Sequence, residues 1–185
     1  MRVEIVEEAE GTPPAWAFPP HADYVDLRAN PQAIEQIAAV RQCPPLRNFL
    51  ATINGAESIF TTSGAIAKAD LPAAVSAGLA YEFASQIRMV FTDTFLNLQR
   101  KQFADLCAGL KELLERETGE ATRAVLRVSC CDFTAESQPG YCLEIRLVAQ
   151  GSSAQQAELR WGLGLARIQQ ALLFRTRVLK QKIAE

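Results

Sequence analysis

The C-terminal segment, residues 154 to 183, constrains the fold most because it predicts one helix that is apolar on two sides. Unbroken, this helix is roughly 45 Å long at 1.5 Å per residue. One stripe of the helix consists of Trp161, Leu165, Ile168, Leu172, Leu179 and Ile183. Nearly opposite lie Leu159, Leu163, Leu173 and Phe174. A helix with two apolar sides is normally buried on both, so we expect the first stripe to cover a core and the second to form an interface with another chain.

Period-two alternation predicts strands ahead of this helix. It is clearest from Tyr81 to Phe91, and residues 123 to 133 and 141 to 149 predict a hairpin around the turn residues between them. The inner face of the hairpin is expected to carry Leu126, Val128, Leu143, Ile145 and Leu147. Residues 58 to 68 predict one bent strand or two short strands around Gly64.

The remaining regular structure is predicted to be helical. Short helices are expected over residues 31 to 42 and from Leu46 to Ile53, with Pro44 and Pro45 ending the first. A long helix is expected from the Thr92-Asp93-Thr94 cluster to about Glu117. The predicted fold is therefore α+β: a mainly antiparallel sheet with two long helices packed on one face and short helices near the N-terminus. Residues 1 to 185 are expected to form a single domain.

Residues 11 to 22 contain four of the nine prolines and predict an extended loop. Trp16 and Phe18 within it are expected to anchor the loop on the body of the protein, because large apolar side chains are costly to expose. The alternative is an arm that covers a ligand.

Composition excludes several classes of protein. With 49% apolar and 22% charged residues the chain is predicted to fold, and no apolar run approaches the length of a membrane span. The acidic first residues do not match a secretory signal, and the five irregularly spaced cysteines do not match a disulfide scaffold, so we expect a cytoplasmic protein. The basic C-terminal tail could bind nucleic acid or anionic lipid, but the pI of about 5.6 argues against a dedicated nucleic-acid binder.

Candidate catalytic and metal-binding groups are sparse. Every Ser-His or Cys-His arrangement requires His21, because it is the only histidine. His21, Asp23 and Asp26 could also ligate a divalent ion, although their spacing matches no specific loop. Nucleotide-binding and hydrolase motifs are missing from the sequence. We therefore predict no catalytic residue, no cofactor and no metal.

The adjacent Cys130 and Cys131 are expected on opposite faces of their strand. Cys131 and Cys142 could form a disulfide if the hairpin places them opposite each other, but buried free thiols are the expectation.

Four arginines are candidate anion ligands. Arg88, Arg127 and Arg146 project from the outer sheet face, where pairing with Glu82 and Glu144 is the alternative. Arg175 falls within the main apolar stripe of the last helix, where an unpaired charge is costly.

These observations favour a non-catalytic protein that self-associates, most simply as a dimer, or binds a protein partner through Leu159, Leu163, Leu173 and Phe174. The alternative is a small-molecule or anion-binding protein, or an enzyme, with a pocket between the sheet and the proline-rich arm that uses Arg88, Arg127 or His21. The order of elements alone is similar to that of small dimeric type III secretion chaperones, although no residue motif carries this analogy.

Overall fold

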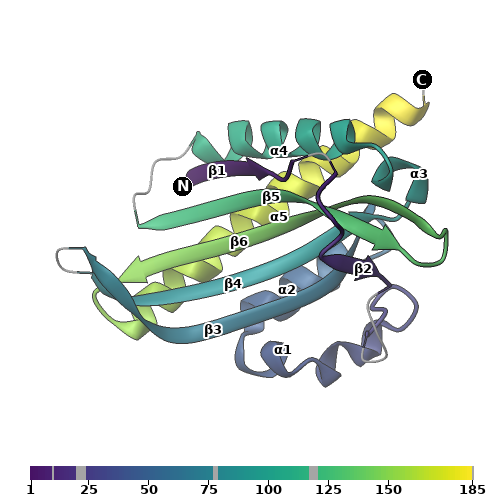
Figure 1. Ribbon diagram of the computed structural model, residues 1–185. Coiled ribbons are helices and arrows are strands. Elements are labelled where there is room, and N and C mark those ends of the chain that lie inside the picture. Colours follow the sequence, from purple (N-terminus) through teal and green to yellow (C-terminus); the bar gives the residue numbers. More distant parts are fainter. Residues whose placement is uncertain (10, 20–23, 77–78, 117–120, 185) are drawn as a thin grey trace.

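The computed structural model describes residues 1–9, 11–19, 24–76, 79–116 and 121–184. A six-stranded mixed sheet is covered on one face by three helices (Figure 1). The strands are β1 (Arg2–Glu7), β2 (Trp16–Phe18), β3 (Phe60–Ser76), β4 (Leu79–Phe91), β5 (Thr122–Phe133) and β6 (Gln138–Gly151). Their order is β1-β5-β6-β4-β3, and β2 continues the edge formed by β1 because it also pairs with β5.

The helices lie mainly on one side of the sheet. They are a 3-10 helix, η1 (Pro31–Gln36), followed by α1 (Ala38–Gln42), α2 (Pro44–Ile53), α3 (Thr94–Asn97), α4 (Arg100–Glu115) and α5 (Ala154–Ala184). α5 crosses behind β6 and β4 and contacts α2 on one flank and α4 on the other (Figure 1). The α+β class and the mostly antiparallel sheet are confirmed, whereas the layer contains α2 as well as the two longer helices.

Two features of the sheet differ from the expected pattern. β1 and β2 both run parallel to β5, whereas every other pairing is antiparallel. In addition, the segment expected as a loop at residues 11 to 22 contains β2, in which Trp16 lies beside Cys131 and Phe18 beside Phe133. The parallel edge adds to the sheet without changing the antiparallel arrangement of its centre.

Helix boundaries also differ for identifiable reasons. The helix expected up to Glu117 is divided, because the buried Asn97 side chain bonds the backbone N–H and C=O of Phe91 and thereby fixes α3 beside the end of β4. α1 ends at Gln42, just ahead of Pro44 and Pro45, as expected, and the two prolines also begin α2, where the missing N–H of proline costs nothing. Extended backbone at Ile37 separates η1 from α1.

The main core lies between the sheet and the helices, where the sequence predicted the inner face of the hairpin. All five predicted hairpin residues are buried: Leu126, Val128, Leu143, Ile145 and Leu147. Trp161 of α5 is fully buried, stacks at 4.5 Å on the Phe83 ring and donates a hydrogen bond of 2.8 Å from Nε1 to Ser85 Oγ. This contact fixes α5 on β4, because a buried indole N–H is costly without an acceptor.

A second, smaller apolar group lies on the opposite face of the sheet. This outer cluster consists of Val90, Cys131, Phe133 and Cys142. Trp16 and Phe18 pack against it, as the anchoring interpretation of the proline-rich segment predicts. The rest of that face carries polar and charged side chains and is called the open face below.

Two glycines of α5 provide a test of the helix packing. A Cβ at Gly164 would lie 3.0 Å from Thr122 Cγ2 and 3.3 Å from Leu147, whereas one at Gly162 would lie 3.3 Å from the edge of the Pro45 ring. We expect Gly162→Ala to raise the free energy of unfolding by up to about 1 kcal/mol through helix propensity. Gly164→Ala should lower the free energy of unfolding by about 1 kcal/mol or more, because Thr122 and Leu147 of the sheet cannot move away from the added Cβ as easily as the edge of the Pro45 ring. Urea denaturation of both variants measures this, and equal stabilisation would contradict the packing.

Candidate functional site

Among α2, α4 and α5, the outward face of α5 carries the most exposed large apolar side chains. Leu159 is 64% exposed, Leu163 58% and Phe174 50%, and the three lie within one stripe of the helix. We call these three residues the outward stripe. Leu173, the fourth predicted interface residue, is only half-buried and lies toward one side. The sequence therefore located the exposed apolar face of α5, while its role in binding stays a prediction.

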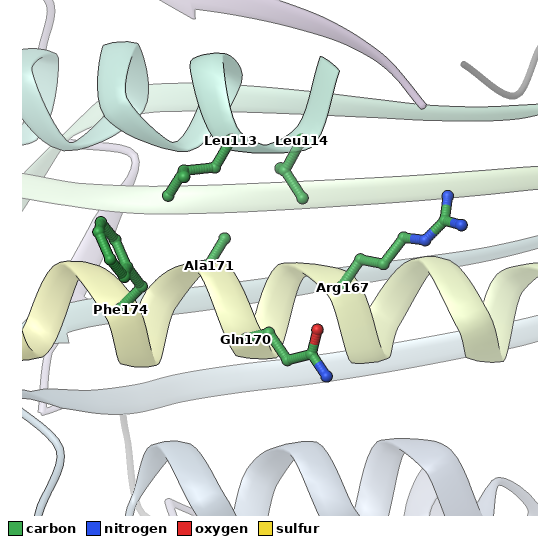
Figure 2. A pocket seen from close by; sticks show the side chains of 6 residues that line it. All are labelled: Leu113, Leu114, Arg167, Gln170, Ala171 and Phe174. Atoms are coloured by element: carbon green, nitrogen blue, oxygen red, sulfur yellow. The ribbon is translucent and has the colours of Figure 1, made fainter. Parts of the chain in front are cut away.

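Two hollows flank the outward stripe at opposite ends. A hollow of about 330 Å³ lies between α5 and the start of α2, lined by Pro45, Gln155, Glu158, Leu159, Gly162 and Leu163. A second hollow of about 220 Å³ lies between α5 and α4, lined by Leu113, Leu114, Arg167, Gln170, Ala171 and Phe174 (Figure 2). In Figure 2 the two leucines of α4 point toward α5, with Phe174 and Arg167 at the two ends of the hollow. Each hollow thus has an apolar wall beside an exposed apolar side chain.

The three arginines expected on the open face share that face but do not converge. Arg88 is held by Trp16, whose ring lies 3.4 Å from the Arg88 guanidinium carbon. Arg127 and Arg146 are exposed on β5 and β6, and Arg127 lies beside Glu144 in the strand register. Glu144 itself accepts a hydrogen bond of 2.7 Å from Gln86.

A different set of arginines surrounds a hollow on the open face. Arg146 lines a cleft of about 440 Å³ together with Arg2 of β1 and Arg123 of β5, and its other lining residues are Glu82, Ala121, Val125, Val148 and Gln150. We call this hollow the arginine cleft. Arg123 forms an ion pair with Glu4, while neither Arg2 nor Arg146 has an acidic partner among the described residues. Sequence reasoning missed Arg2 and Arg123, although both alternate with inward-facing residues of their strands.

Arg175 belongs to neither hollow. Its guanidinium lies against the backbone of α4 at Gly109, where a Cβ would come within 2.7 Å of the guanidinium carbon. The buried Nε of Arg175 has no hydrogen-bond partner in the described part of the chain. Arg175 is therefore a packed side chain between α4 and α5.

The pocket expected between the sheet and the proline-rich arm exists with a different lining. It measures about 440 Å³ and includes Phe18, Tyr24, Arg28, Phe133 and Glu136, but neither Arg88 nor Arg127. Arg28 already donates hydrogen bonds to the carbonyls of Gly55, Ser58 and Phe60. His21 and Asp23 lie outside the described residues, and Asp26 accepts hydrogen bonds from the backbone of Arg28 and Ala29.

Comparisons with known proteins gave no match that bears on these hollows. No family model matches the chain, and searches of curated proteins and of solved structures gave no match. None of the described helices combines the length and hydropathy that a membrane span needs.

Replacing Arg175 tests whether its buried guanidinium has an ion-pair or hydrogen-bond partner. We expect Arg175→Met to raise the free energy of unfolding by about 0.5–1 kcal/mol, because it keeps the side-chain volume and removes a buried N–H that has no acceptor. Arg177→Met, two residues further along α5 and exposed, should change stability by less than about 0.5 kcal/mol. Thermal and urea denaturation measure both variants. A loss of stability confined to Arg175→Met would show that the charge has a partner in solution.

Proposed function

We propose that this is a non-catalytic protein that works by association, and that the outward stripe of α5 binds a second copy of the same chain. The observation that carries the proposal is the position of Leu159, Leu163 and Phe174 on the outer side of a helix that is already packed on its inner side and both flanks. Exposed apolar side chains that line up on one element are typical of interfaces.

The arrangement of the stripe favours a two-fold symmetric partner. Leu159 and Phe174 lie near opposite ends of the exposed face, about 22 Å apart along the helix at 1.5 Å per residue. A two-fold axis that passes near Ala166 and Arg167 brings Phe174 of one copy level along α5 with Leu159 of the other, where the α2 side hollow lies. The same axis brings Leu159 level with the α4 side hollow. One surface thus supplies both the projecting side chains and the hollows, as a closed dimer requires.

Charge along α5 supports the antiparallel arrangement. Glu158 is exposed near the start of the helix, where Arg160 bonds the Gln150 carbonyl, while the exposed Arg177 and Lys180, the latter paired with Glu57 at 3.4 Å, lie near its end. Two antiparallel copies of α5 bring the acidic end of each helix toward the basic end of the other. A parallel arrangement would instead place the two basic ends together, which like-charge repulsion disfavours.

Paired charge substitutions test the interface. We expect the purified chain to sediment as a dimer and Leu163→Glu with Phe174→Glu to be monomeric, with at least about a hundredfold weaker self-association. The melting temperature of the monomer should change little beyond the lost dimer contribution, since both residues are exposed. Sedimentation velocity over a range of concentrations and native mass spectrometry measure the subunit number.

The matched control carries the same two charge changes elsewhere. Phe95 is 68% exposed and Ile66 51% exposed, and neither belongs to α5. Phe95→Glu with Ile66→Glu should leave the dimer intact. A wild-type chain that stays monomeric at high concentration, or a dimer that survives the α5 substitutions, would overturn the proposal.

The arginine cleft supports a second candidate function, the binding of a small anion or of an acidic side chain. Arg2 and Arg146 face the cleft without acidic partners among the described residues, while Glu82 is the acid in its lining. Arginine side chains bind carboxylate and phosphate groups through paired N–H donors.

Pyrophosphate is a suitable probe of the cleft. We expect weak binding at low salt by isothermal titration calorimetry, and about a tenfold loss of affinity in Arg146→Gln. Arg127→Gln is the matched control, because Arg127 is exposed on the same face but does not line the cleft. Equal losses in both variants would indicate general attraction by surface charge and would contradict a defined site.

A further inference from the structure

Two of the five cysteines meet on the sheet face opposite the helices. Cys131 of β5 and Cys142 of β6 belong to the outer cluster and are 2% and 1% exposed. In the hairpin register Cys131 lies opposite Gly140 and Cys142 opposite Ser129, so the two cysteines are diagonal neighbours on one face. The Cys131 thiol lies 4.0 Å from the backbone carbonyl oxygen of Asp132, the Cys131 and Cys142 side chains interact with each other, and both thiols are free.

The surroundings divide the roles of the two sulfurs. The hydrogen bond from the Cys142 thiol, helped by the positive charge of Arg88, lowers the pKa of Cys131, although burial and Asp132 oppose the shift. The same hydrogen bond, together with burial, raises the pKa of Cys142. These opposite directions favour Cys131 as the thiolate and Cys142 as the neighbouring thiol. Arg88 is kept in place by the stacking of Trp16 at 3.4 Å.

Unlike Cys131, the other three cysteines have raised pKa values. Burial raises the pKa of Cys43 and Cys130, and it raises that of Cys107 to about 12. Cys107 packs in the main core, and Cys130 lies on the helix side of β5 beside Glu8, which accepts a hydrogen bond from the Cys130 backbone. These thiols match the ordinary behaviour of buried cysteine, which is unreactive.

We propose that Cys131 and Cys142 form a two-thiol redox site that reacts with a hydroperoxide. The Cys131 thiolate attacks one peroxide oxygen, the O–O bond breaks, and the leaving oxygen takes up a proton as water or an alcohol. Cys131 is then a sulfenic acid. The Cys142 sulfur attacks the Cys131 sulfur, the S–O bond breaks, and the hydroxyl leaves as water with the Cys142 proton. The two thiols lose two electrons and two protons in total, and the peroxide gains them.

The diagonal placement predicts that this disulfide is easily reduced. Diagonal neighbours across an antiparallel pair have Cα atoms about 7–8 Å apart, which is wider than the usual spacing in a disulfide. The bond therefore requires a shift of the ends of β5 and β6 near the turn that joins them. Strained disulfides have more oxidising potentials and are typical of reversible sites.

Trp16 and Phe18 limit access to the two thiols. Both side chains pack against the outer cluster from β2, a strand of only three residues. A peroxide reaches Cys131 only when this short strand moves aside. Removing the Trp16 side chain should therefore expose the two thiols. Removing the Arg88 charge should instead make the Cys131 thiolate less stable.

The test is oxidation of the full-length reduced protein with hydrogen peroxide, followed by mass spectrometry. We expect the loss of two hydrogen atoms and no added oxygen, reversed by dithiothreitol. Trypsin leaves all three hairpin cysteines in one peptide, so a protease that cuts after Glu136 is needed to separate Cys130 and Cys131 from Cys142. Cys130→Ala should form the same disulfide, which assigns it to Cys131.

Five variants and one control separate the roles of the residues. Cys142→Ala should stop at a Cys131 sulfenic acid that dimedone traps, and Cys131→Ala should not react at the pair. Arg88→Gln should slow the reaction about three- to tenfold, while Arg88→Lys, which keeps the charge, should slow it less. Trp16→Ala should speed it, and Phe95→Ala is the exposed aromatic control that should not change it.

Oxygen added to Cys43 or Cys107 before the pair reacts would overturn the proposal. A disulfide that forms through Cys130 would also overturn it, as would unchanged oxidation of Cys142 in Cys131→Ala. Circular dichroism of each variant confirms that it is folded before its rate is compared. A folded wild type that keeps both thiols through prolonged peroxide treatment contradicts the site directly.

Discussion

The packing of Trp161 on the sheet determines how both faces of α5 are used. The indole is fully buried, donates its N–H to Ser85 and stacks on Phe83, so this side of the helix is held against β4. Leu159 and Leu163 lie two residues before and after Trp161, which is about 200° around an α-helix. Burying Trp161 therefore turns both leucines outward. A single core contact thus sets the core of the domain and the exposed stripe that we propose as its interface.

The opposite face of the sheet is divided by the short strand β2. Trp16 and Phe18 cover one end, where Cys131, Cys142 and Val90 form an apolar cluster beneath them. β2 contains only three residues, so the other end stays uncovered and carries the arginine cleft. Because side chains alternate along a strand, every strand points side chains toward this face along its whole length. The length of β2 determines which of them are covered, such as the two thiols, and which stay exposed, such as the arginines.

Sequence patterns predicted the parts of the structure that depend on local periodicity. The alternation in β4, β5 and β6 identified the inner face of the sheet, and the helical period separated Trp161 from Leu163. The parallel pairing of β1 with β5 was missed because it joins segments more than a hundred residues apart, and short-range patterns carry no record of such a partner. The register of Cys131 with Gly140 was equally out of reach, since it depends on the length and geometry of the turn. The arginine cleft was missed for both reasons, because it combines Arg2 of β1 with Arg123 and Arg146 of the hairpin.

Charge distinguishes which face of the domain is suited to binding a second copy. Two open faces brought together by a two-fold axis would place arginine clefts of the same sign in one interface, and desolvating like charges is unfavourable. The outward stripe of α5 has apolar side chains and adjacent hollows, and its ends carry opposite charges when two copies run antiparallel. Association through the helices also leaves the other sheet face, with the arginine cleft and the covered Cys131 and Cys142, on the outer side of the pair. The two proposed interactions therefore use separate faces of the domain, the helix layer and the sheet face.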